Sequence, residues 1–136
     1  IARSRRVDGM IVANTTLARP DSLRETSRAG EQGGLSGRPL FRLSTRMVAE
    51  TYVRAEGAFP LIGVGGIDSG GAALTKIRAG ASLIQLYSAL VYKGHGLVED
   101  IKRNLASTLL RTGRDSLSEI VGADAATLTA EDWPVR

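Results

Sequence analysis

The chain has no cysteine among its 136 residues, which excludes disulfides, a thiolate nucleophile and a cysteine-based metal site. Its one histidine, His95, follows Lys93 and stands between two glycines, which predicts a loop. A functional histidine needs partner groups around it, so we expect His95 to be exposed to solvent. We therefore assign neither a metal site nor histidine-based catalysis to this chain.

Aromatic residues make up only 4% of the chain, and none of them alternates with basic residues. The formal charge is +4, and Arg3, Arg5 and Arg6 form a small basic cluster. We expect no nucleic-acid partner, because this basic cluster has no aromatic residues interleaved with it. No apolar run approaches the roughly 20 residues that span a bilayer, and no signal peptide opens the sequence.

Three short apolar runs alternate with helical patterns, as expected for a globular α/β chain. Strands are predicted over residues 10–13, 61–64 and 83–86. Helices are predicted over residues 45–56, capped by Ser44, and from Asp68 or Ser69 to Gly80. A further helix is predicted over residues 96–110, stopped by Gly113. The strand–helix–strand order predicts parallel pairing.

The two ends of the chain carry weaker patterns. Residues 1–6 are interpreted as the end of a helix cut off at its start, within a larger protein. Ser116 and Glu119 form a capping box that opens a short last helix ending at Gly122. The polar residues 123–136 are predicted to be a surface tail.

Three βα units cannot close a barrel of eight strands. We therefore interpret residues 1–122 as the C-terminal part of a (β/α)₈ TIM-barrel domain, contributing its sixth, seventh and eighth strands.

A glycine pair, Gly65-Gly66, follows the second predicted strand. Without a Cβ atom, such a turn allows a ligand to approach the backbone, and its N–H groups suit a phosphate. The second alternative is that the glycines only permit tight packing, and the glycines alone leave both open.

Polar residues also follow the first predicted strand, at Asn14, Thr15 and Thr16. Barrel enzymes place binding groups at the C-terminal ends of strands, although asparagine is also a common turn residue. The connection over residues 17–40 is long and rich in glycine, which indicates function or mobility.

Four motifs in this order and spacing resemble the dihydroorotate dehydrogenase family. Arg38-Pro39-Leu40 and Tyr87-Ser88 further resemble its membrane-associated, quinone-using class 2, and the resemblance runs from about residue 7 to residue 123. The motifs are Asn14-Thr15-Thr16, Gly33-Gly34-Leu35-Ser36-Gly37, Ile62-Gly63-Val64-Gly65-Gly66 and Gln85-Leu86-Tyr87-Ser88-Ala89-Leu90.

The resemblance implies roles for seven residues. Asn14 and Thr15 would hydrogen-bond the pyrimidine substrate. The cofactor FMN would be contacted by the backbone of Gly37, Gly65 and Gly66, with its phosphate held by Tyr87 and Ser88. Ala13 departs from the family pattern, because many members have a threonine there that contacts FMN.

The implied reaction is the oxidation of dihydroorotate to orotate, by hydride transfer to the flavin, with a quinone as electron acceptor, in pyrimidine biosynthesis. The general base is expected upstream, so no catalytic residue is assigned here and the rest of the barrel is required. A missing N-terminal part would contact the membrane surface, on the cytoplasmic side of the inner membrane.

Two alternatives remain open from the residues. One is another phosphate-binding barrel enzyme, an isomerase or lyase without flavin. The other is a half-barrel without catalytic activity.

Overall fold

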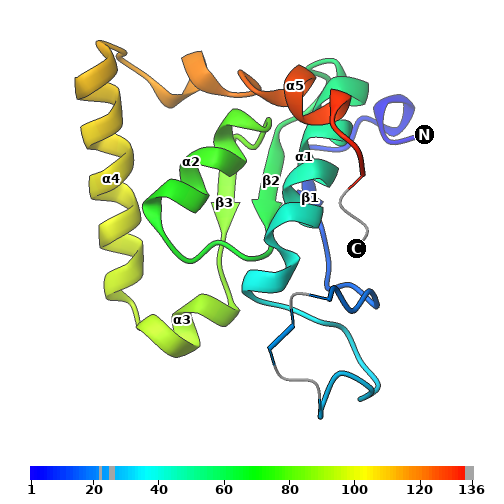
Figure 1. Cartoon of the computed structure of the whole chain (residues 1–136). Coiled ribbons are helices and arrows are strands. Elements are labelled where there is room, and N and C mark those ends of the chain that lie inside the picture. The colour runs from blue at the N-terminus through cyan, green and yellow to red at the C-terminus, as the bar shows by residue number, and fades with distance from the viewer. Residues whose placement is uncertain (22, 25–26, 134–136) are drawn as a thin grey trace.

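A three-stranded parallel sheet forms the centre of the computed structural model, which describes residues 1–21, 23–24 and 27–133 (Figure 1). The strand order is β1 (Met10–Val12), β2 (Leu61–Val64) and β3 (Leu83–Gln85). Met10 pairs with Leu61, and Ile62 pairs with Leu83. The predicted α/β class and parallel strands are confirmed.

Helices connect and flank these strands. A 3₁₀ turn, η2 (Arg38–Leu40), leads into α1 (Phe41–Ala55), and α2 (Gly70–Arg78) joins β2 to β3. The chain then forms α3 (Ser88–Lys93), α4 (Gly96–Thr112), the 3₁₀ turn η3 (Leu117–Ile120) and α5 (Ala125–Ala130). After α4 it returns across the molecule to α1, against which α5 packs (Figure 1). Among the described residues, no helix is both long and apolar enough to cross a membrane.

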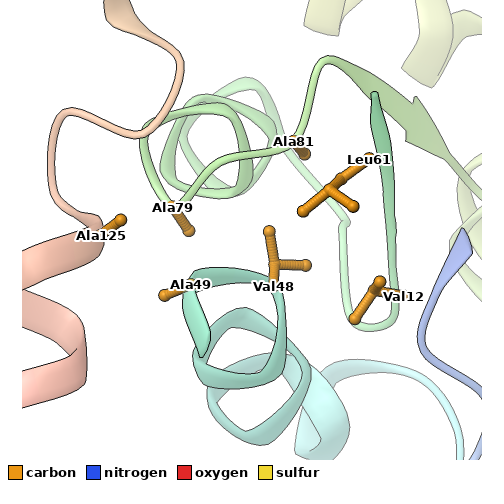
Figure 2. Packing of buried hydrophobic residues seen from close by; sticks show 7 residues of the cluster. All are labelled: Val12, Val48, Ala49, Leu61, Ala79, Ala81 and Ala125. Atoms are coloured by element: carbon orange, nitrogen blue, oxygen red, sulfur yellow. The ribbon is translucent and has the colours of Figure 1, made fainter. Parts of the chain in front are cut away.

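The core lies on one face of the sheet. Figure 2 shows Val48 of α1 and Leu61 of β2 in the space between that helix and the sheet, where both side chains are almost fully buried. The other face is open: Ile11 and Leu83 expose 57% and 59% of their surface. Strand residues alternate between faces, so Val12 is buried while its neighbour Ile11 is not.

Two predicted helix starts had opposite outcomes. Ser69 caps α2 as predicted, since its Oγ accepts a hydrogen bond from the Ala72 N–H at 3.2 Å. The prediction that Ser44 caps α1 is wrong. Pro39 in the preceding 3₁₀ turn starts the helix earlier, at Phe41, so Ser44 lies buried within its first turn.

Two expectations for the ends of the chain changed, and one internal helix was not predicted. Residues 1–6 contain only a single 3₁₀ turn, η1 (Arg3–Arg5), and the helix α3 was not predicted. The prediction of a surface tail is wrong for residues 123–133, because Ala125 of α5 is 2% exposed and belongs to the core. Residues 134–136 lie outside the described part. The capping box of Ser116 and Glu119 is confirmed, on the 3₁₀ turn η3.

Arg46 of α1 attaches the C-terminal segment. Its side chain is 11% exposed, pairs with Glu50 at 2.8 Å and lies over the Trp133 ring, 5.2 Å from the centroid. Its guanidinium donates to three backbone carbonyls at the end of α5, those of Leu128, Thr129 and Glu131. Because one charged group satisfies three helix-terminal acceptors, Arg46 stabilises the docking of α5.

Replacing Arg46 with alanine should detach this segment. Hydrogen bonds from a charged donor contribute about 1.5–3 kcal/mol each at most, so we expect a loss of about 2–3 kcal/mol in the free energy of unfolding. Urea unfolding measures it. Arg54→Ala is the control, because Arg54 pairs with the same Glu50 but its side chain is 72% exposed. Equal losses in the two variants would contradict a specific role of Arg46.

Lys76 of α2 is fully buried between α1 and the sheet. Its Nζ donates a 2.6 Å hydrogen bond to Ser44 Oγ, and no carboxylate in the described part of the chain forms an ion pair with it. Burial lowers the pKa of Lys76 to about 7.

The depressed pKa of Lys76 predicts a pH dependence of stability. In the unfolded chain, lysine keeps its ordinary pKa of about 10.4. Between the two pKa values the unfolded state binds more protons, so the stability of the ligand-free protein should rise with pH in that window. Urea unfolding at several pH values measures the rise. Lys76→Met should remove this rise, whereas Lys102→Met, on the exposed side of α4, should keep it; a rise that survives Lys76→Met would have another origin.

Candidate functional site

A cavity of about 510 Å³ lies at the C-terminal ends of the three strands. The arrowheads of β2 and β3 point toward this side of the molecule, where α3 and the long β1–α1 connection also lie (Figure 1). The seven residues predicted for the site all line it: Asn14, Thr15, Gly37, Gly65, Gly66, Tyr87 and Ser88. Segments far apart in sequence therefore meet at one place.

The end of β1 packs against the glycine-rich loop. Thr16 and Leu35 exchange two backbone hydrogen bonds, of 3.1 and 2.7 Å. A Cβ atom on Gly34 would lie only 1.9 Å from Thr15 Oγ1, so glycine is required there by the threonine. Asn14 Oδ1 accepts from the Thr15 N–H at 2.7 Å, which orients the asparagine amide. Both Asn14 and Thr15 are exposed toward solvent.

Arg19 organises the long connection between β1 and α1. Its guanidinium donates to the carbonyls of Ala29, Glu31 and Gly33 at 2.9–3.0 Å. The partly buried Arg19 side chain therefore holds the described part of the connection in place. The loop over residues 33–37 follows directly and reaches the cavity.

The glycine pair after β2 packs on the first turn of α1. A Cβ atom on Gly66 would lie 2.6 Å from Phe41 Cα, and one on Gly65 would lie 2.9 Å from Ser44 Oγ. Both glycines also have positive φ angles, of 99° and 72° for Gly65 and Gly66. Tight packing thus accounts for the pair by itself. Yet the N–H groups of Gly66 and Ile67 donate to no other described residue, and both residues line the cavity.

The end of β3 leads directly into α3. Tyr87 is 80% exposed, and Ser88 opens the helix. The Ser88 Oγ donates to Ser36 Oγ at 3.1 Å, and a Cβ atom on Gly37 would touch the Ser88 side chain at 3.9 Å. The glycine-rich loop therefore contacts the ends of both β1 and β3 and forms one wall of the cavity.

Three charged residues in the cavity wall were not predicted for the site. Arg38 Nε pairs with Asp68 Oδ2 at 2.8 Å, and Lys93 Nζ donates to the Asp68 carbonyl at 2.7 Å. Two cations and one carboxylate favour an anionic ligand. Lys93 was missed because α3 was not predicted; a helix starting at Ser88 would have placed it near the cavity.

The structure also bears on metal binding and on His95. No group of three potential metal ligands comes together among the described residues. His95 is exposed and precedes α4, away from the cavity lining.

Comparison with known proteins identifies the family. The family model of dihydroorotate dehydrogenase matches residues 1–109. A protein of Bradyrhizobium diazoefficiens named dihydroorotate dehydrogenase (quinone) is 87% identical over 98% of this chain. A protein of the same name from Rhodopseudomonas palustris is 87% identical over 99%. The chain spans 37% of the length of each relative.

Solved structures agree with this assignment. Ligand-free DHODH from Eimeria tenella has a TM-score of 0.84 and 39% identity, covering 90% of this chain and 34% of its own. The complex of that organism's DHODH with ferulenol has the same TM-score, 0.84, and 40% identity, covering 90% of this chain and 32% of its own. The chain belongs to the dihydroorotate dehydrogenase family.

Proposed function

We propose that this chain is the C-terminal three βα units of a (β/α)₈ barrel in a quinone-dependent dihydroorotate dehydrogenase. Its 37% coverage of similar proteins with that name supports a segment of a larger enzyme. The open face of the sheet supports it independently. Parallel sheets are normally covered on both faces, and in a barrel Ile11 and Leu83 would face the closed interior.

The cavity fits the phosphate end of FMN. Gly66 and Ile67 line the cavity and offer N–H groups that donate to no other described residue. Arg38, Asp68 and Lys93 together give the wall a net positive charge. Gly37, Gly65 and Gly66 would hold FMN by backbone contacts, while Tyr87 and Ser88 would bind its phosphate. Ala13 lines the cavity but can donate no hydrogen bond from its side chain.

Asn14 and Thr15 are the proposed substrate residues. An amide and a hydroxyl can pair with the carboxylate and with the ring N–H and C=O groups of dihydroorotate and orotate. Because Asn14 Oδ1 already accepts from the Thr15 N–H, its NH₂ group is the part that would donate to substrate.

The reaction we propose is the oxidation of dihydroorotate to orotate in pyrimidine biosynthesis. FMN, when bound, supplies the hydride acceptor and passes the electrons to a quinone. This chain binds and orients both molecules at one edge of the sheet. The general base, the quinone contact and a peripheral attachment to the inner membrane, on its cytoplasmic side, belong to the rest of the enzyme.

The observation that carries this proposal is that seven predicted residues, six after the three strand ends and Gly37 in the glycine-rich loop, line one cavity. The test uses the full-length enzyme that carries this chain. It should show flavin absorbance and reduce a quinone only when dihydroorotate is present. A colourless protein would instead favour a phosphate-binding isomerase or lyase.

Replacing Asn14 with alanine in the full-length enzyme should weaken orotate binding while the flavin spectrum is kept. Loss of a hydrogen-bond partner costs about 1–3 kcal/mol, or roughly tenfold to a hundredfold in affinity. Thr15→Val should have the same effect more mildly. Orotate titration of the flavin absorbance measures it. Asn104→Ala, at an exposed position on α4, is the control. Loss of flavin in place of orotate would mean that Asn14 lies on the cofactor side.

Replacing Gly34 with alanine should also weaken orotate binding, although Gly34 itself carries no side chain. The new Cβ atom would occupy the position of Thr15 Oγ1 and displace that side chain. Misplacement of a binding group impairs positioning, so we expect a loss in orotate affinity about as large as that of Thr15→Val. Gly30→Ala is the matched control, because a Cβ atom there has nothing within 4 Å. Equal effects of the two substitutions would show that the clash with Thr15 is not the cause.

A further inference from the structure

Lys76 occupies an unusual position for a charged residue. Its side chain is fully buried (0% exposed) behind the Gly65-Gly66 turn, on the side of β2 that faces α1. Its Nζ lies 2.6 Å from Ser44 Oγ and 3.5 Å from the Phe41 carbonyl oxygen. It also lies 5.1 Å from the centroid of the Phe41 ring. All its polar partners are therefore in the first turn of α1.

None of these partners is an anion. Within the described residues, the carboxylates of the neighbouring elements are engaged elsewhere: Glu50 of α1 binds two arginines, and Asp68, ahead of α2, binds Arg38. Burial of an unpaired cation is costly unless an opposite charge compensates it. The lowered pKa of Lys76 is the sign of that cost. In the described chain, the compensating charge is not supplied by the protein.

A hydrogen-bonded chain connects Lys76 to the cavity wall. The ammonium can only donate, so Ser44 Oγ accepts from it. The single Ser44 proton has two carbonyl acceptors within reach, that of Gly65 at 3.0 Å and that of Phe41 at 3.1 Å. Gly65 and Gly66 form the turn that lines the cavity. Ser44 therefore contacts this turn from the side opposite the cavity, and Lys76 in turn contacts Ser44.

We propose that Lys76 is a positioning residue for the cofactor phosphate. Acting through Ser44, it holds the Gly65 carbonyl and so sets the turn whose Gly66 and Ile67 N–H groups receive the phosphate. Its buried charge is compensated by the phosphate and not by a carboxylate. This inference rests on the proposed function, because it requires that the ligand of the cavity is FMN.

Because the buried charge of Lys76 has no counter-ion, an experiment can distinguish a positioning role of this residue from a packing role. Lys76→Met keeps a similar apolar volume and removes the charge, a change that often leaves stability equal or higher. A merely structural lysine would lose stability and affinity together. A positioning lysine should lose affinity for a phosphate-bearing ligand without losing stability of the flavin-free protein.

The experiment compares FMN with riboflavin, which lacks the phosphate, on flavin-free full-length enzyme that carries this chain. Quenching of flavin fluorescence gives both dissociation constants, and thermal unfolding without flavin gives Tm. Lys76→Met should weaken FMN roughly tenfold to a hundredfold, leave riboflavin within about twofold, and not lower Tm. The ³¹P resonance of bound FMN should shift as well. Lys102→Met, on the exposed side of α4, is the matched control.

Ser44→Ala tests the same chain of contacts from its middle. It should also weaken FMN more than riboflavin, and adding Lys76→Met should cost little more, because the two residues act through one path. If Lys76→Met does not fold, Ser44→Ala alone decides.

Two results would overturn the inference while the proposed function stands: normal FMN affinity in the variants, or equal losses for FMN and riboflavin. A wild-type enzyme that binds no flavin would overturn both.

Discussion

The contact between the Gly65-Gly66 turn and the first turn of α1 is the constraint on which the site depends. No atom beyond hydrogen fits on Gly66, since a Cβ atom there would lie 2.6 Å from Phe41 Cα. The α1 helix must therefore start where it does, and the 3₁₀ turn containing Pro39 brings it there. Because β2 ends in this contact, the position of the strand end, the helix start and the cavity wall are fixed together.

Parallel pairing of the three strands then brings further residues to the same edge of the sheet as this contact. The C-terminal ends of neighbouring parallel strands lie at the same edge of the sheet, so whatever follows β1 and β3 is delivered beside the glycine turn. The glycine-rich loop joins them, touching Thr15 on one side and Ser88 on the other. Arg19 holds the carbonyls that precede this loop. The cavity is thus assembled from segments that have no local reason to meet.

The sequence predicted those parts of the fold that local patterns determine. The strand β2 was predicted with its observed bounds, because the short apolar run Leu61–Val64 ends at a glycine pair. Ser44 was misplaced because a serine before a helical pattern has the features of a cap, and only the structure shows it accepting from Lys76. The helix α3 and the burial of Ala125 depend on long-range packing, which no local pattern records. The seven residues expected at the site line one cavity, whereas Arg38, Asp68 and Lys93 in its wall were not expected there, and the roles of all of them stay proposals.

The glycine pair Gly65-Gly66 can be explained by packing as well as by ligand binding. Packing against α1 requires both glycines even if no ligand binds, so their presence alone cannot argue for a phosphate. The argument for an anion comes from features that packing does not require. The N–H groups of Gly66 and Ile67 have no partner in the described chain, Arg38 and Lys93 stand in the wall, and a buried ammonium lies behind the turn without a carboxylate. Asp68 neutralises Arg38 in the wall, so the charges of Lys93 and Lys76 remain beside the unpaired backbone donors. Packing alone does not require these charges, whereas a phosphate would pair with them and with the N–H groups.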